Sequence, residues 1–308
     1  MKNQYTGDIG DYGKYGLLRH LSENGADILV NWYLTENDGS ADGKHTSYLE
    51  NEKKFRRYDP ELFDILNKLV DSGNRSITAI ETENCIKNAT YYHAMLTPDT
   101  DRKEWHRNCL SAAAGKSLVF LDPDNGLSGK KKSAKDSVKF CFPDEVADYY
   151  NLGADVLYYC QRDRSSADVW HSRLKDMQSY LPDAIVRAIT CHRGTQRAYI
   201  FVLHEESKKK YSEMIDDFIH KWNGFFTNEQ ISSISGTADG IKPGRYRHYK
   251  GNEYEVICLA KHSETEEMMV VYKALYGEGQ VWVRPAYMWN DTVTKDGQET
   301  KRFTYIGE

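Results

Sequence analysis

The chain lacks a cysteine pair at metal-binding spacing and lacks a long apolar run. Its six cysteines are scattered, and none forms a C-x-x-C pair, which argues against a zinc ribbon and against a secreted disulfide scaffold. No apolar segment approaches the length that spans a bilayer, and the first residues are polar, unlike a signal peptide. These absences predict a cytoplasmic protein with no membrane partner.

Excess positive charge is also lacking. Lys and Arg number 41 against 46 Asp and Glu, for a formal net charge of −5. The chain is therefore no globally basic nucleic-acid coat, and any contact with nucleic acid must come from a local patch. No internal repeat is present. The length of 308 residues is typical of about two domains.

The segment that says most about function covers residues 118–126. Four apolar residues run directly into Asp122-Pro-Asp-Asn-Gly. Such a run is typical of a strand buried on both faces, which Pro123 would end and Gly126 would turn. Ligands bind at the carboxyl edge of open α/β sheets, so Asp122, Asp124 and Asn125 are candidate functional residues. An ordinary turn has the same composition, however.

Alternating patterns of strand and helix extend over the first 230 residues. Helices are predicted at 11–23, 60–70, 100–113, 142–150, 168–180 and 207–222, and strands at 28–34, 76–80, 117–121 and 155–160. Two further strands, 184–191 and 196–204, are joined by a short turn as an antiparallel hairpin. The pattern predicts an α/β fold with a Rossmann-like, mostly parallel sheet that ends in this hairpin.

The composition changes near residue 230. Residues 231–244 are rich in Ser, Gly and Ala and are predicted to be a linker between a catalytic domain, 1–230, and a second domain, 245–308. Short β-type runs at 253–260, 268–274 and 280–284 predict a small all-β, barrel-like domain. Its interleaved aromatic and basic residues suit either a barrel core or stacking on nucleic-acid bases.

Three further groups of residues could carry chemistry. Residues 7–15 place Asp8, Asp11 and Lys14 among three glycines just before a helix, where a ligand can approach the backbone closely. A capped N-terminal loop would look the same. The acidic loop 36–43 offers Asp38, Asp42 and Gly43 and begins like an EF-hand, but Leu49 stands where that motif needs Glu.

Glu81 follows the predicted strand 76–80, where an acid could meet a ribose hydroxyl or a metal. A basic rim is predicted from residues 130–132, 161–164, 192–194 and Arg197, although solvated surface charges would read the same. If the acids converge, Asp38, Asp42, Asp122 and Asp124 could instead bind Mg²⁺.

The tail resembles a small bacterial domain family of unknown function. The resemblance rests on these segments: Tyr-Arg-His-Tyr-Lys-Gly at 246–251, His262 with Glu264, Val-Tyr-Lys-Ala-Leu-Tyr at 271–276, Trp-Val-Arg-Pro at 282–285, and Arg302-Phe303.

Residues 1–228 resemble the RlmJ-like ribosomal RNA adenine methyltransferases, which have a class I Rossmann-like fold. In that family a Gly/Asp/Lys segment precedes the first strand, an acidic Gly-rich loop follows it, and Asp-Pro-Pro-Tyr ends a later strand. The matching stretches here are 7–14, 35–43 and 122–125. Asp-Pro-Asp-Asn replaces Asp-Pro-Pro-Tyr, so the aromatic residue that would stack on a flipped base is missing.

The resemblance implies an S-adenosylmethionine-dependent enzyme that acts on nucleic acid or a nucleotide. Asp122, Asp124, Asn125 and Lys14 would then be catalytic, and Asp8, Asp11, Asp38, Asp42, Gly43 and Glu81 would bind the cofactor. Two alternatives remain open from the residues: a Mg²⁺-dependent phosphodiesterase or nuclease that uses the acids as metal ligands, and a non-catalytic nucleic-acid-binding or sensing protein. No feature of the sequence indicates the oligomeric state.

Overall fold

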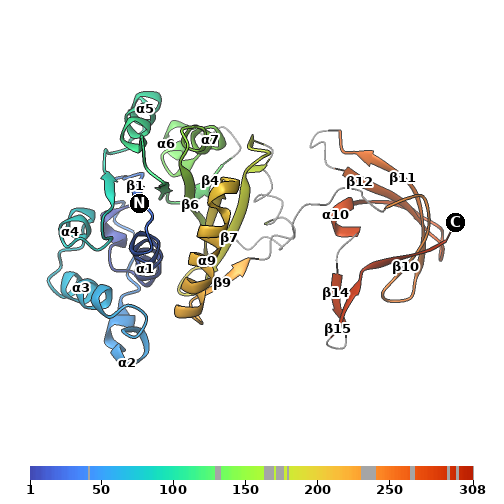
Figure 1. Ribbon diagram of the computed structural model, residues 1–308, viewed down its shortest axis with the longest axis horizontal. Coiled ribbons are helices and arrows are strands. Elements are labelled where there is room, and N and C mark those ends of the chain that lie inside the picture. Colours follow the sequence, from blue (N-terminus) through green and yellow to red (C-terminus); the bar gives the residue numbers. More distant parts are fainter. Residues whose placement is uncertain are drawn as a thin grey trace. The chain divides into compact units, whose positions relative to one another are not determined.

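The computed structural model describes residues 1–40, 42–128, 133–162, 170, 177–178, 180–229, 241–263, 268–289, 292–295 and 298–307. The chain forms two compact units, Met1–Gln230 and Ile231–Glu308 (Figure 1). No helix among the described residues is both long and apolar enough to cross a membrane.

The N-terminal unit is built on a seven-stranded sheet in the order β2-β1-β3-β6-β8-β7-β9. Its strands are β1 (Ile28–Asn31), β2 (Thr90–Tyr92), β3 (Leu118–Leu121), β6 (Asp155–Gln161), β7 (Ile185–Cys191), β8 (Arg197–Leu203) and β9 (Phe226–Glu229). Strands β2, β1, β3 and β6 are parallel, whereas β8, β7 and β9 pair antiparallel. The predicted mixed α/β sheet with a parallel core and a closing hairpin is confirmed.

The longer helices are α1 (Ile9–Glu23), α3 (Pro60–Asp71), α5 (Arg102–Ala113), α7 (Pro143–Asn151) and α9 (Glu205–Lys221). Several begin at an Asp side chain that accepts a backbone N–H: Asp8 accepts from Gly10, Asp59 from Leu62, and Asp101 from Lys103 and Glu104. Helices lie against both faces of the sheet. Ile28 and Val30 of β1 share a core with α1, whereas Asn31 on the opposite face contacts Tyr149 of α7.

Short elements connect these parts: η1 (Asn3–Tyr5), η2 (Ser47–Glu50), α2 (Glu52–Phe55), α4 (Ile77–Thr82), α6 (Ala134–Ser137), β4 (Gly126–Leu127) and β5 (Phe140–Cys141). The predicted strand 76–80 is wrong, because Ser76 caps helix α4 by accepting from the N–H of Ala79. The residues after Ser76 are apolar and partly β-branched, which favours a strand, but this preference does not outweigh the helix cap. Strand β1 lies between β3 and β2, and no strand is predicted from the sequence at the position of β2.

Two other expectations fall mainly on residues that the structure does not describe. Of the predicted helix 168–180, only residues 170, 177–178 and 180 are described. Of the predicted linker 231–244, only residues 241–244 are described.

Helix α1 lies very close to the antiparallel part of the sheet because its inner side carries glycines. A Cβ on Gly16 would overlap the indole ring of Trp222, and one on Gly10 would overlap the guanidinium of Arg197. This close approach places the first turn of α1 beside the hairpin.

The C-terminal unit is a five-stranded antiparallel sheet in the order β13-β12-β11-β10-β16. It consists of β10 (Gly244–His248), β11 (Glu253–Lys261), β12 (Met268–Ala274), β13 (Val281–Pro285) and β16 (Phe303–Gly307), with α10 (Ala286–Trp289) and the hairpin of β14 (Thr292–Lys295) and β15 (Gln298–Lys301). The predicted small all-β unit is confirmed. Tyr246 and Tyr272 belong to its core, where Trp289 stacks on Phe303 with ring centroids 3.9 Å apart.

Candidate functional site

A polar cavity of about 320 Å³ lies in the N-terminal unit, at the carboxyl ends of β3 and β6 and beside the start of α1. Every predicted site residue except Glu81 lines it: Asp8, Asp11, Lys14, Asp38, Asp42, Gly43, Asp122, Asp124 and Asn125. Gly126, with φ of +97°, turns the chain after these acids so that β4 pairs with β5. The three acidic stretches, far apart in sequence, therefore meet at one edge of the sheet, as parallel strand order requires.

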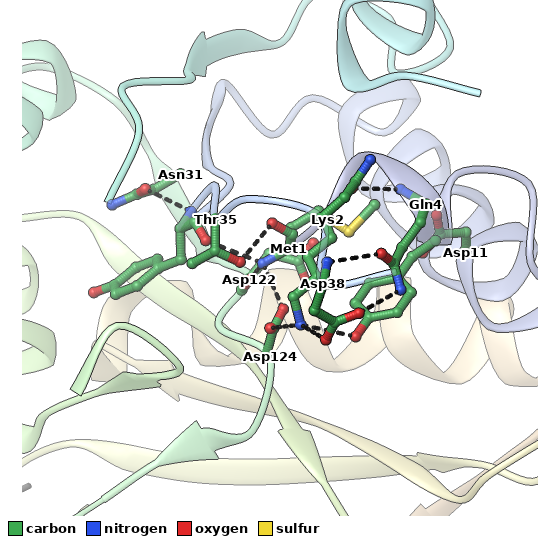
Figure 2. A network of polar contacts seen from close by, with 12 residues as sticks. Met1, Lys2, Gln4, Asp11, Asn31, Thr35, Asp38, Asp122 and Asp124 are labelled. Atoms are coloured by element: carbon green, nitrogen blue, oxygen red, sulfur yellow. Dashed lines mark hydrogen bonds and ion pairs between the residues drawn. The ribbon is translucent and has the colours of Figure 1, made fainter. Parts of the chain in front are cut away.

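One part of the cavity is a binding site for an ammonium group. The Met1 α-ammonium donates to the backbone oxygens of Tyr33 and Asp122, both at 3.0 Å. Its nitrogen also lies 2.9 Å from Oδ1 of Asp124. Figure 2 shows how Met1, Asp122 and Asp124 converge. We call these three oxygens the ammonium subsite; they come from the chain segments that follow the neighbouring strands β1 and β3.

Asp124 is shared between two cations. Lys2 Nζ lies 2.8 Å from Oδ2 of Asp124 and 3.1 Å from Oδ2 of Asp38 (Figure 2). Burial works to raise the pKa of Asp124, but the Met1 ammonium and Lys2 outweigh it, so the pKa lies below its usual value. Asp124 is therefore a buried carboxylate at neutral pH.

Lys14 joins the first turns of α1 to the end of β3. Its Nζ lies 2.8 Å from Oδ1 of Asp11, one helical turn earlier, and 2.7 Å from Oδ2 of Asp122. Burial alone would lower the pKa of Lys14, but the two carboxylates raise it above its usual value. Tyr15 donates to the other oxygen of Asp11 at 3.0 Å. Lys14 is thus a fixed, charged group that neutralises Asp122.

Asp8 has a positioning role rather than an open coordination site. Its Oδ1 accepts from the N–H of Gly10 at 2.8 Å and lies 3.2 Å from a guanidinium nitrogen of Arg197. Its Oδ2 accepts from the N–H of His45 at 3.2 Å. The capping residue of α1 therefore ties the helix to the hairpin and to His45, which follows the acidic loop.

Met1, Lys2 and Arg75 were not identified from the sequence. Arg75 donates to the carbonyl oxygens of Thr6 at 2.7 Å and Gln4 at 2.8 Å, and also to that of Gly43. These bonds hold the segment around Gln4 and Thr6 against Gly43 of the acidic loop. No local pattern marks Arg75, because its partners are backbone oxygens of distant segments.

Glu81 lies outside the cavity, which corrects its predicted placement at the end of a strand. It belongs to α4, accepts from Trp32 Nε1 at 2.9 Å and lies 3.4 Å from Nδ1 of His93. Of the predicted basic rim, Gln161 and Arg197 line the cavity. Residues 130–132 and 163–164 lie outside the described residues.

The acids do not form a metal-binding group in the described part of the chain. No cluster of three or more His, Cys, Asp or Glu side chains that could hold an ion is found there. Oδ2 of Asp122 and both carboxylate oxygens of Asp124 already face ammonium groups. A divalent ion bound at these oxygens would have to displace Lys14, Lys2 or the Met1 ammonium.

Comparisons with known proteins give different matches for the two units. The family described as "Protein of unknown function (DUF1653)" matches residues 244–305. A crystal structure of a DUF1653 protein from Bordetella bronchiseptica is 38% identical, and the match covers 94% of that chain and 23% of this one, with a TM-score of 0.22. The C-terminal unit is a DUF1653 domain. The resemblance of the tail to a bacterial domain of unknown function is thereby confirmed.

The N-terminal unit is similar in structure to protein LPL1258 from Legionella pneumophila str. Philadelphia 1, of the family DUF519. The identity is 12%, and the match covers 72% of this chain and 96% of that chain with a TM-score of 0.38. At this identity and TM-score the likeness assigns neither a fold nor an activity to the N-terminal unit. No curated protein matches the chain.

Proposed function

We propose that the N-terminal unit binds S-adenosylmethionine and methylates an amine of a nucleic acid or nucleotide. The observation that carries the proposal is the ammonium subsite formed by Tyr33, Asp122 and Asp124. Two backbone carbonyls and a carboxylate are the acceptors that a primary ammonium requires. S-adenosylmethionine carries such an ammonium on its methionyl half.

The side chain of Met1 extends this argument. Its sulfur lies 3.5 Å from Nζ of Lys14, so Met1 places an α-ammonium and a thioether together in the cavity. The methionyl half of S-adenosylmethionine carries the same α-ammonium, but its sulfur is a cationic sulfonium, which would have to lie away from the Lys14 ammonium. Since Met1 fills the subsite in this structure, binding of the cofactor requires Met1 to leave it.

The cavity residues would then have separate roles in binding and catalysis. Tyr33, Asp122 and Asp124 would hold the ammonium end of S-adenosylmethionine, which supplies an electrophilic methyl group when bound. Asn125 also lines the cavity beside Asp124 and has an amide that can orient a target amine. Lys14 keeps Asp122 in place through their 2.7 Å contact.

Calorimetric titration of the full chain with S-adenosylmethionine, without added metal, tests the proposal. We expect one site per chain and a loss of affinity of at least about tenfold in Asp124→Asn, because a charge-assisted contact to the ammonium is removed. Asp27→Asn is the matched control, since Asp27 precedes β1 at its other end and pairs with Lys116 at 2.9 Å.

The nuclease alternative is tested in the same series. Mg²⁺ binding with metal-dependent cleavage of nucleic acid, in a protein that does not bind S-adenosylmethionine, would overturn the proposal. The ion pairs around Asp122 and Asp124 favour the methyltransferase alternative.

A further inference from the structure

The C-terminal unit distributes its basic residues differently over the two faces of its sheet. Along β10 the side chains alternate, so that Arg245 and Arg247 lie on one face and Tyr246 and His248 on the other, which is the face of the aromatic core. Arg245 and Arg247 each form an ion pair with Glu253, at 2.8 and 2.9 Å. The arginines of the outer face therefore have a carboxylate partner within the sheet.

Basic side chains gather at one end of the inner face. The sheet is curved (Figure 1), and although β13 and β16 are its two edges, the guanidinium of Arg284 on β13 lies 5.7 Å from the ring centroid of Phe303 on β16. The ring of His248 lies 4.9 Å from the same ring. We call the basic residues at this place the cationic cluster: His248, Lys250, Arg284 and Arg302.

The charges that act on this cluster are positive. In the described part of the chain, no carboxylate lies within ion-pair distance of Arg284 or Lys250, and both contact aromatic rings instead. Burial lowers the pKa of His248, and the charges of Arg302, Arg284 and Lys250 lower it further. Positive charges that converge repel one another, and a bound anion would relieve that repulsion.

Tyrosine rings adjoin the cationic cluster. The ring of Tyr254 lies 6.3 Å from that of His248 and 5.4 Å from that of Tyr276. The hydroxyls of Tyr254 and Tyr276 lie 2.7 Å apart, which fixes the two rings relative to each other. Tyr276 is 48% exposed, so a ligand can reach its ring. Aromatic rings beside cations are the combination that binds single-stranded nucleic acid, because the cations contact phosphates while bases stack on the rings.

We propose that the C-terminal unit binds single-stranded nucleic acid, with backbone phosphates at the cationic cluster and a base stacked on Tyr276. A guanidinium such as that of Arg284 matches the oxygens of a phosphate with its paired N–H donors. A strand supplies phosphates and flat bases together, whereas an inorganic anion has no ring for Tyr276. The inference does not rest on the function proposed above, because it concerns the other unit.

Fluorescence anisotropy of the full-length protein with a labelled oligouridylate of about 12 nucleotides, which spans one such site, tests the proposal. Arg284→Gln should weaken binding about tenfold and reduce the slope of log affinity against log salt by about 1, because one phosphate contact is lost. Lys250→Gln should act in the same direction. Lys250 is exposed in the turn after β10, so its substitution should leave the Tm unchanged and separates binding from folding.

Tyr276→Leu probes the stacking contact. It should weaken binding of the oligouridylate about fivefold or more without changing the salt slope, because stacking on a ring releases no counterion. A change in the salt slope equal to that of Arg284→Gln would contradict the assignment of Tyr276 to a base.

Arg247→Gln is the matched control. It removes the same charge from the same unit, but Arg247 lies on the outer face and pairs with Glu253, so affinity should stay nearly unchanged. Equal losses in Arg247→Gln and Arg284→Gln would overturn the inference, because net charge alone would then explain binding. Unchanged binding in both Arg284→Gln and Lys250→Gln would overturn it as well.

Competition identifies the ligand. Uridine monophosphate and inorganic phosphate should displace the labelled strand only at concentrations about a hundredfold higher than the unlabelled strand, since each offers a single contact. Displacement by either of them, or by polyglutamate, at the concentration of the unlabelled strand would rule out a nucleic-acid strand as the ligand.

The two proposals can fail separately. Asp124→Asn changes the cavity of the N-terminal unit and should leave binding of the oligouridylate unchanged. Loss of that binding in Asp124→Asn, with no loss in the variants of the cationic cluster, would place the strand in the N-terminal unit and overturn this inference. Cluster-dependent binding in a protein that does not bind S-adenosylmethionine would overturn only the methyltransferase proposal.

Discussion

Lys14 Nζ lies 2.7 Å from Oδ2 of Asp122, although 108 residues separate them in the chain. Both side chains are about 95% buried, and Asp11 lies on the other side of the same ammonium at 2.8 Å. The pair connects helix α1, which precedes the first strand, to the loop that follows strand β3. It sets the position of the Asp-Pro-Asp-Asn loop on which the proposed function depends.

Lys14→Met should destabilise the protein strongly. It leaves Asp11 and Asp122 buried without a cation, and removal of one partner from a buried pair costs about 3–5 kcal/mol. Urea unfolding measures the change. Lys68→Met is the control: Lys68 pairs with Glu83 at 2.8 Å but is 68% exposed, so its loss should cost less than about 1 kcal/mol. Equal effects of the two substitutions would refute the structural role of Lys14.

The stability contribution of Asp124 should depend on pH. Its pKa in the folded protein is lowered, so its contribution is complete above the unfolded pKa of about 3.9 and is lost as pH falls through the lower folded value. Wild type should therefore exceed Asp124→Asn in unfolding free energy at pH 6, and the difference should shrink below about pH 4. A difference that stays constant down to pH 2.5 would show that Asp124 is not held as a carboxylate.

Gly16→Ala should destabilise the N-terminal unit even though alanine favours helices by about 1 kcal/mol over glycine. The new Cβ would overlap the ring of Trp222, which is 1% exposed and cannot move aside freely. Gly13→Ala is the graded comparison, because its Cβ would lie 3.2 Å from the ring of Phe226. In thermal unfolding, the Tm of Gly16→Ala should be lower than that of Gly13→Ala. The opposite order would contradict the close packing of α1.

Glu81→Gln should leave the binding of S-adenosylmethionine unchanged. Glu81 lies outside the cavity, and an amide oxygen can still accept from Trp32 Nε1, whose present contact is 2.9 Å. The titrations that detect the effect of Asp124→Asn would measure this. A loss of cofactor affinity in Glu81→Gln would restore the role that the sequence pattern assigned to this residue.

Much of the N-terminal fold follows from local signals. The apolar run 118–121 is strand β3, buried at each position, and Asp122 follows it directly. Asp59 with Pro60 marks the start of α3, which ends at Asp71. Such signals act over a few residues and are therefore readable along the chain. Ser76 carries the same kind of signal, but the apolar residues after it hid the helix that it caps.

The sequence alone determined that acids follow two predicted strands, Asp122 and Asp124 after the run 118–121 and the acidic loop after 28–34, but it left open whether they converge. Only the tertiary structure decided which charged groups pair with these acids. Lys14, Lys2 and the Met1 ammonium neutralise the acids, and Arg197 of the hairpin lines the same cavity. Ion pairs and cavity walls depend on distances between segments that lie far apart in the chain, and no local period or cap encodes those distances.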